Sequence, residues 1–190
     1  MPRPEKLKVA FIGSHGVGKT TLCYGLAARL KSSDYPVEVV HEVARRCPLP
    51  INEETSVASE SWILHTQIAE EIVAAYRYPV VICDRSALDN YVYLLLSSAP
   101  REELERLVDT WMTSYDLLVH VPVVEEPSPD GIRSADPTFQ RAVEERLDRE
   151  LAARGLFAFR LDAGARTGWL DAVEAAVRER LRPAQLRIPI

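Results

Sequence analysis

The stretch that decides the fold is residues 13–20, which read Gly13-Ser14-His15-Gly16-Val17-Gly18-Lys19-Thr20. It fits the pattern GxxxxGK[ST], follows an apolar run at residues 8–12 and opens a stretch of helical periodicity at 19–32. Glycines there permit positive φ angles, so that backbone N–H groups approach phosphate oxygens, and a helix N-terminus favours anions. The stretch therefore predicts a loop that binds the phosphates of ATP with residues 13–21, Thr21 included. Lys19 should reach the β- and γ-phosphates, and the Thr20 hydroxyl should bind Mg²⁺.

Working outward from this loop, the chain alternates between two kinds of segment. Five apolar runs, mostly continuous as in strands buried on both faces of a parallel sheet, occupy residues 8–12, 37–41, 80–83, 117–121 and 156–161. Stretches of helical periodicity lie between and after them, at 19–32, 56–78, 86–96, 101–113, 137–154 and 169–181. Strands that alternate with helices imply right-handed βαβ units. We predict α/β architecture: a three-layer αβα sandwich with a five-stranded parallel sheet, forming one domain over residues 1–190.

One connection is unusually long. Residues 123–136 contain Pro127, Pro129 and Gly131 and should not form regular structure. Long loops in compact domains are often active-site lids, so we expect a lid segment near 123–140. The alternative is a flexible surface loop.

The composition narrows the classes of function. A net charge of −5 and a pI of about 5.5 argue against a nucleic-acid partner. No apolar run approaches the ~20 residues that span a bilayer, and the run at 9–12 is too short for the core of a signal peptide. Cys23, Cys47 and Cys83 are odd in number and widely spaced, as expected of reduced thiols. We expect a cytoplasmic protein that does not bind membranes.

A second carboxylate-bearing strand suggests where the metal lies. Residues 80–84 are an apolar run that ends in Asp84, the pattern that holds the Mg²⁺ shell beside a phosphate loop. Ligands bind outside the carboxyl ends of the strands in parallel sheets. Gly13, Glu42, Asp84 and the loop at 122–136 should therefore surround one crevice.

Two classes of nucleotide-binding protein fit poorly. A GTPase switch needs Asn-Lys-x-Asp to read guanine, but the only asparagines are Asn52 and Asn90, and neither precedes a lysine. An AAA+ motor would need a further helical domain, for which the chain is short. A kinase-like arrangement or an uncommitted ATPase is left.

The chain resembles the P-loop nucleoside and nucleotide kinase superfamily, especially kinase-like ATPases similar to nicotinamide riboside kinases, and it partly resembles deoxynucleoside kinases. The resemblance rests on residues 13–21, on 41–45 (His-Glu-Val-Ala-Arg), on 84–86 (Asp-Arg-Ser) with Asp89 and Tyr93, and on 130–133 (Asp-Gly-Ile-Arg). Only the first segment is a specific motif by itself. The other segments are short, and it is their order and spacing that support the resemblance. The resemblance implies transfer of the ATP γ-phosphate to a small nucleoside-like acceptor.

The resemblance also implies catalytic roles. Glu42 takes the place of a catalytic acid, which accepts the proton of an attacking hydroxyl or holds a Mg²⁺-bound water; otherwise it is a solvent-facing glutamate. Arg85 would pair with substrate or transferred phosphate, or simply with Glu42 or Asp84. Arg133 would close over ATP as the lid arginine, or be a surface residue.

The acceptor side is less specified. Trp62 could stack on a flat ring while Gln67 reads its polar edge, although core packing explains Trp62 as well. Arg45 could help at the rim or be solvated. Asp89 lies four residues from Tyr93 on one helix face, where it could touch a ribose or cap the helix. The competing class is a non-transferring ATPase, or a nucleotide-gated binding protein that acts on a protein partner. A homodimer is a possible assembly.

Overall fold

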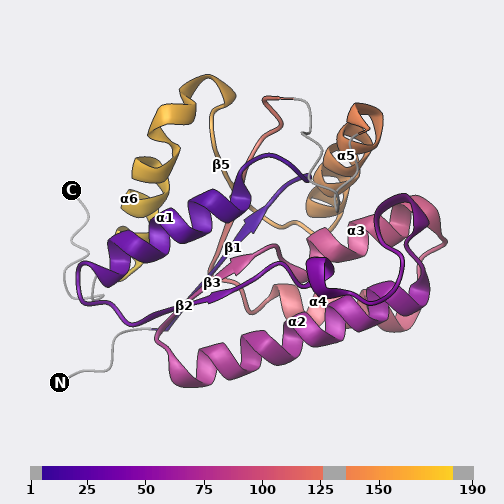
Figure 1. The fold of residues 1–190 in the computed structure, drawn as a ribbon, viewed down its shortest axis with the longest axis horizontal. Helices are drawn as coiled ribbons and strands as arrows, with labels where there is room; N and C mark the ends of the chain where they lie inside the picture. Colours follow the sequence, from indigo (N-terminus) through magenta and orange to yellow (C-terminus); the bar gives the residue numbers. More distant parts are fainter. Residues whose placement is uncertain (1–5, 126–135, 182–190) are drawn as a thin grey trace.

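The computed structural model describes residues 6–125 and 136–181, and its core is one parallel sheet (Figure 1). The strands are β1 (Leu7–Ile12), β2 (Val37–Val40), β3 (Val80–Asp84), β4 (Leu117–His120) and β5 (Phe159–Arg160). Every pairing is parallel and the order is β2-β3-β1-β4-β5. The predicted five-stranded parallel sheet is confirmed. The fifth strand is shorter than its apolar run, because only Phe159 and Arg160 pair with β4 at the sheet edge.

In the described part of the chain, six α-helices surround the sheet, as predicted. They are α1 (Lys19–Lys31), α2 (Val57–Arg77), α3 (Ala87–Ser97), α4 (Glu102–Met112), α5 (Pro137–Ala153) and α6 (Trp169–Leu181). Three short 3₁₀ helices that we did not predict lie in the connections: η1 (Val43–Arg46), η2 (Asn52–Glu54) and η3 (Ala163–Gly168). The first two link β2 to α2 and pass over the carboxyl end of the sheet.

The helices form two layers, one on each face of the sheet (Figure 1). Alternate residues of the central strand point to opposite faces, as in any strand. Val9 and Phe11 of β1 pack in the cluster that contains α1 and α6, whereas Ala10 and Ile12 pack with α2, α3, α4 and α5. All four of these side chains have no exposed surface. The three-layer sandwich is therefore confirmed.

Local sequence signals fix where the helices beside the site begin. Ser56 starts α2 and Ser86 starts α3, each with a capping box in which the side chains of the cap and the third helical residue bond each other's backbone N–H. Asp136 caps α5 and is followed by Pro137 in the first turn. Because of these caps, α3 begins at Ala87, soon after the end of β3, and α5 begins at Pro137.

Of the expected lid, the structure describes residues 123–125 and 136–140 only; Arg133 lies outside the described residues. Within the described ranges, no helix has the length and apolar character needed to cross a membrane.

Candidate nucleotide and acceptor site

The loop after β1 has the backbone that a phosphate cradle requires. Gly13, Gly16 and Gly18 have φ angles of 133°, 78° and 96°. A Cβ at Gly13 would lie 2.5 Å from the carbonyl oxygen of Val121, so only glycine fits there. A Cβ at Gly18 would meet nothing within 4 Å. The loop is thus packed at Gly13 against Val121, the residue after β4, and is open beside Gly18.

Helix α5 holds the start of this loop. The Ser14 hydroxyl donates to the carbonyl oxygen of Gln140 over 2.8 Å, and the Gln140 side chain donates to the carbonyl oxygen of His15 over 2.9 Å. The Ser14 backbone N–H donates to Glu144 over 3.1 Å. Sequence reasoning missed this contact, because nothing in the spacing connects residues that are 125 or more positions apart.

Lys19 begins α1 and lies over the loop. Its side chain is buried, and its ammonium group donates to the carbonyl oxygens of Gly13, over 2.8 Å, and of Ser14. Burial lowers the pKa of Lys19 to about 8, and the positive charge of Arg85 acts in the same direction. The lysine is thus held where an incoming phosphate would replace the two carbonyl groups as its partner.

Thr20 and Asp84 lie together, as predicted for a Mg²⁺ site. The Thr20 hydroxyl donates to Asp84 Oδ2 over 2.6 Å. Among the described residues no three His, Cys, Asp or Glu side chains form a metal-binding group. Mg²⁺ keeps several waters and takes one or two protein oxygens plus phosphate oxygens, so Thr20 and Asp84 are the residues that could hold it. Of the other predicted loop residues, Val17 packs in the core below α1, and Thr21 is exposed in the first turn of that helix.

Beside the loop, Glu42 and Arg85 form a buried ion pair. Nε of Arg85 donates to Glu42 Oε1 over 2.7 Å, and Nε of Arg45 donates to Glu42 Oε2 over 2.8 Å. Glu42 and Arg85 are 7% and 3% exposed, so water screens their charges little. Glu42 is therefore not a solvent-facing glutamate, which was the alternative to a catalytic acid. Arg85 pairs with Glu42, as its own alternative role required.

Arg85 also has a strained backbone. Its φ angle is 98°, which non-glycine residues rarely adopt and which costs roughly 1–3 kcal/mol. Its N–H donates to the Phe11 carbonyl over 3.1 Å, and its carbonyl accepts from the Gln67 side chain over 2.9 Å. These bonds turn the guanidinium toward the phosphate loop. Strain of this kind is concentrated at functional sites.

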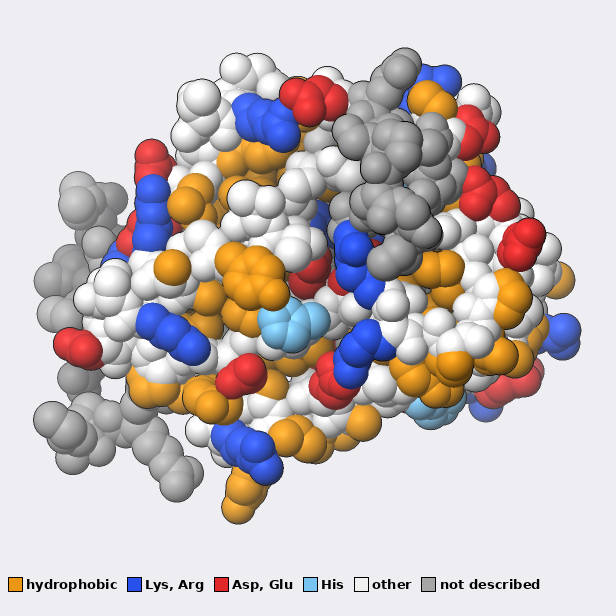
Figure 2. Space-filling view, viewed as in Figure 1, with side chains coloured by type: hydrophobic (Ala, Val, Ile, Leu, Met, Phe, Trp, Pro, Cys, Tyr) orange, Lys and Arg blue, Asp and Glu red, His pale blue; other side chains and the backbone are white. Residues whose placement is uncertain are grey.

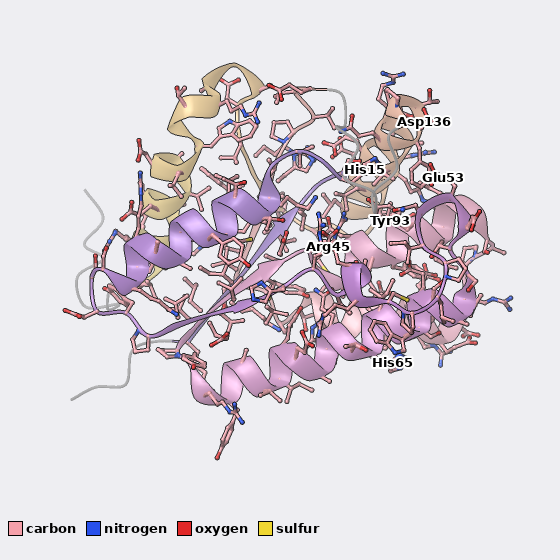
Figure 3. All side chains as sticks on the ribbon, viewed as in Figure 1. His15, Arg45, Glu53, His65, Tyr93 and Asp136 are labelled. Carbon is pink, nitrogen blue, oxygen red and sulfur yellow. The ribbon has the colours of Figure 1, made fainter. Side chains whose placement is uncertain are left out.

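The guanidinium of Arg85 reaches Tyr93, whose hydroxyl in turn lies beside His15. Nη2 donates to the Tyr93 hydroxyl over 3.3 Å, and that hydroxyl lies 3.2 Å from Nδ1 of His15 (Figure 3). Nη1 of Arg85 is buried and makes no hydrogen bond to any described residue. A buried donor without a partner is rare and costly, so Nη1 is the atom that a ligand in this pocket would satisfy.

Gln67 lies behind Arg85 instead of facing open space. Its amide nitrogen donates to Glu71 Oε1 and to the Arg85 carbonyl, both over 2.9 Å, and its oxygen accepts from Asn90. With both donors and the acceptor engaged, Gln67 has little left to offer a ligand. Its position suits the support of Arg85 better than the predicted reading of a ring edge.

Asp89 and Trp62 lie away from the pocket. Asp89 Oδ1 accepts from the Gly13 N–H over 2.9 Å, and Oδ2 accepts from the backbone and hydroxyl of Ser86 over 3.0 and 2.6 Å. Burial raises the pKa of Asp89. Asp89 thus ties α3 to the phosphate loop, as the capping alternative anticipated. Trp62 is half-buried on α2 and does not line the pocket beside Arg85.

Two hollows meet at Glu42 and Arg45. The larger is an open groove between β2 and α2, seen in Figure 2 where charged side chains of both signs gather across the face. The smaller is an enclosed pocket of about 20 Å³, room for about one water. It is lined by the cluster already described and by residues of η2, α2 and α3: His15, Glu42, Ala44, Arg45, Ile51, Asn52, Glu60, Ile63, Arg85, Asn90 and Tyr93. The smaller pocket adjoins the phosphate loop through His15, so the chemistry belongs there.

Comparison with known proteins agrees with this fold. A family described as an AAA domain matches residues 8–166. No curated protein matches the chain. Among solved structures, deoxyadenosine kinase from M. mycoides with bound dATP superposes with a TM-score of 0.61 and 16% identity, over 90% of this chain and 99% of that chain. The same enzyme with dCMP and dCDP bound gives 0.62 and 16%, over 91% and 100%.

Thymidylate kinase from Ehrlichia chaffeensis gives a TM-score of 0.63 and 17% identity, over 94% of this chain and 100% of that chain. At such identities the likeness establishes the fold, not the substrate. The family match covers most of the chain, including both the phosphate loop and the Glu42–Arg85 pair. The chain therefore belongs to this AAA-domain family and has the P-loop nucleotide kinase fold.

Proposed function

We propose that the protein transfers the γ-phosphate of Mg-ATP to a small nucleoside-like or nucleotide acceptor in the cytoplasm. The observation that carries the proposal is the buried pair of Glu42 and Arg85 beside the phosphate loop, where both residues line an enclosed pocket and Nη1 of Arg85 makes no hydrogen bond to a described residue. Proteins of the same fold include a deoxyadenosine kinase whose structures contain dATP or dCMP and dCDP, which supports a nucleotide-type substrate.

Each residue of the cluster has a defined task in this reaction. Lys19 would leave its two carbonyl partners and bind the β- and γ-phosphates. Thr20 and Asp84 would hold Mg²⁺, which neutralises phosphate charge when it is bound. Arg85 would stabilise charge on the transferring phosphoryl group through Nη1. Arg133 keeps its proposed role as the lid arginine.

Glu42 is the proposed base when the acceptor is a hydroxyl group. Its Oε1 bonds Arg85 and its Oε2 bonds Arg45, so the carboxylate is held in one orientation at the pocket wall. A positioned carboxylate that takes the proton of the attacking hydroxyl contributes ~100-fold or more to the rate. A monophosphate acceptor would need no base, and Glu42 would then only orient the two arginines.

The second candidate is a nucleotide-gated ATPase that acts on a protein partner. The observation that favours it is the open groove at the edge strand β2, which meets the enclosed pocket at Glu42 and Arg45. It predicts steady ATP hydrolysis that no small acceptor changes.

The deciding experiment follows radiolabelled γ-phosphate from Mg-ATP into a panel of nucleosides, nucleoside monophosphates and nicotinamide riboside. We expect label on one acceptor, with kcat lowered at least ~100-fold by Lys19→Ala and by Glu42→Gln. Lys31→Ala, at the exposed end of α1, is the control and should retain activity. Label in free phosphate alone, at a rate that no acceptor alters, would exclude the kinase for this panel and favour the ATPase.

Because Glu42 and Arg85 are paired in the interior, every variant at these positions needs a stability measurement. Removing one partner of a buried pair leaves an uncompensated charge, which costs roughly 3–5 kcal/mol. Glu42→Gln keeps an oxygen that can accept from Arg85. Its free energy of unfolding in urea should lie within about 2 kcal/mol of that of the parent protein. An activity loss that simply follows unfolding would remove Glu42 from the mechanism.

A further inference from the structure

Glu60 is a buried carboxyl group that the proposed mechanism does not use. It belongs to the first turn of α2, is 3% exposed and lines the same enclosed pocket as Arg85. Its Oε1 accepts from the Thr55 hydroxyl over 3.1 Å. Its Oε2 has no hydrogen-bond partner among the described residues. Glu60 and Arg85 both line the pocket, and each has one buried polar atom, Oε2 and Nη1, without a hydrogen bond to a described residue.

The carboxyl group of Glu60 differs from that of Glu42, which is paired with Arg85. Among the described residues no arginine or lysine bonds Glu60, so no direct ion pair there offsets its burial. Burial raises the pKa of Glu60 from 4.5 to about 8, against the hydrogen bond from Thr55 and the charge of Arg85. The titratable groups that share its pocket are, besides Arg85, His15 of the phosphate loop, Glu42, Arg45 and Tyr93 of α3. A neutral carboxyl group has one O–H to donate.

The two residues reach the pocket from different elements. Arg85 contacts Tyr93 and Glu42, next to the phosphate loop. Glu60 belongs to the buried face of α2, and Thr55, at the end of η2, donates to its Oε1. An acceptor with its reactive group at Arg85 would therefore lie in a pocket that Glu60 also lines.

We propose that Glu60 determines which acceptor the pocket takes, by donating a hydrogen bond from its carboxylic acid to a carbonyl oxygen or unprotonated ring nitrogen of a neutral heterocycle. This inference rests on the proposed function and adds the substrate class. The pocket as it stands holds about one water, so binding requires the described connection around η2 to move outward. A site built to hydrogen-bond one group rejects molecules that leave its buried atom unpaired.

The test uses the full-length protein and measures binding separately from transfer. Thymidine, deoxycytidine, deoxyadenosine and deoxyguanosine are titrated into the parent protein, Glu60→Gln and Glu60→Leu by calorimetry, at pH 6.5 and pH 9. We expect at least one nucleoside to bind, with Glu60→Leu weakening it about 30-fold. Glu60→Gln retains an N–H donor and should bind within about fivefold of the parent protein at pH 6.5.

The pH series isolates the carboxylic acid. Above its pKa of about 8 the Glu60 side chain loses its O–H, so the parent protein should bind the nucleoside at least ~10-fold more weakly at pH 9 than at pH 6.5. Glu60→Gln cannot ionise and should bind equally at both pH values. The infrared band of a protonated carboxyl, present in the parent protein and absent from Glu60→Gln, should shift when the nucleoside binds.

Three results would overturn the proposal: no nucleoside of the four binds, Glu60→Leu binds as the parent protein does, or no protonated-carboxyl band exists at pH 6.5. The second result, unchanged binding by Glu60→Leu, is also the one expected if a single water, and not the nucleoside, hydrogen-bonds Glu60. Phosphoryl transfer measured on the same samples keeps the two ideas apart. Binding through Glu60 without transfer refutes the kinase alone, and transfer that Glu60→Leu leaves unchanged refutes only the role of Glu60.

Discussion

Replacing Glu60 by glutamine should make the protein more stable at neutral pH and should flatten the pH dependence of its stability. Folding raises the pKa of the Glu60 carboxyl from 4.5 to about 8 because the folded chain buries it. The folded state then binds more protons than the unfolded state between these pH values. The stability that depends on this proton is fully present below pH 4.5, falls as the pH rises and is lost by about pH 8.

The size of the effect follows from the two pKa values. Each pH unit between them changes the free energy of unfolding by about 1.4 kcal/mol for one proton. At pH 7 the parent protein is therefore about 3 kcal/mol less stable than it would be with a carboxyl that never ionised. Glutamine keeps the oxygen that accepts from Thr55 and carries no ionisable proton.

Urea unfolding of the parent protein and Glu60→Gln at pH 5, 6, 7 and 8 measures this difference directly. Between pH 5 and pH 8, we expect the free energy of unfolding of the variant to rise by about 4 kcal/mol relative to that of the parent protein. Glu54→Gln, which changes an exposed glutamate of η2, controls for the substitution itself. Parallel curves for the parent protein and Glu60→Gln, with a constant difference at all four pH values, would show that Glu60 ionises normally and would refute the reasoning.

Three further predictions concern the sheet and the phosphate loop. Gly13→Ala should lower the free energy of unfolding by at least ~2 kcal/mol in urea, because φ is 133° and the new Cβ would meet a carbonyl oxygen at 2.5 Å. Gly25→Ala should change it by under ~1 kcal/mol, because its Cβ meets only a flexible leucine side chain; equal losses would contradict this. Lys8→Met should cost about 3–5 kcal/mol, since it leaves Glu71 charged with no exposed surface, and a loss below ~1 kcal/mol would mean that the pair contributes little. Finally, ATP should bind with proton uptake near pH 8, as phosphate restores the charge on Lys19, so calorimetry should show weaker binding as the pH rises above 8; a flat profile would contradict the lowered pKa.

The fold was largely predictable because each of its signals is local. Continuous apolar runs marked the buried strands, and stretches of helical periodicity marked the helices. The phosphate loop was predictable for the same reason, since its glycines are adjacent in the sequence. The η1 and η2 turns were not, because short 3₁₀ segments carry no periodicity of their own.

The acceptor side was harder because its chemistry depends on which face of α2 is buried. The buried positions of that helix include Glu60, Ile63, Gln67 and Glu71, spaced three or four apart. This spacing was visible in the sequence, and a carboxylate on an apolar stripe was the available signal for Glu60. Trp62, two residues further along, carries the more conspicuous side chain at this end of the helix. The engagement of Gln67 by Asn90 and Arg85 needed coordinates.

The clamp at the start of the phosphate loop has a consequence for solution measurements. The amide protons of Gly13 and Ser14 are bonded to Asp89 and Glu144, carboxylates 76 and 130 residues away. Both should exchange slowly with deuterated solvent before any nucleotide is added, since release requires α3 or α5 to detach. The amide of Gly18 makes no such bond within the described chain and should slow only when phosphate arrives. Residue-resolved exchange would thus report the docking of the helices and the occupancy of the cradle as two separate signals from one loop.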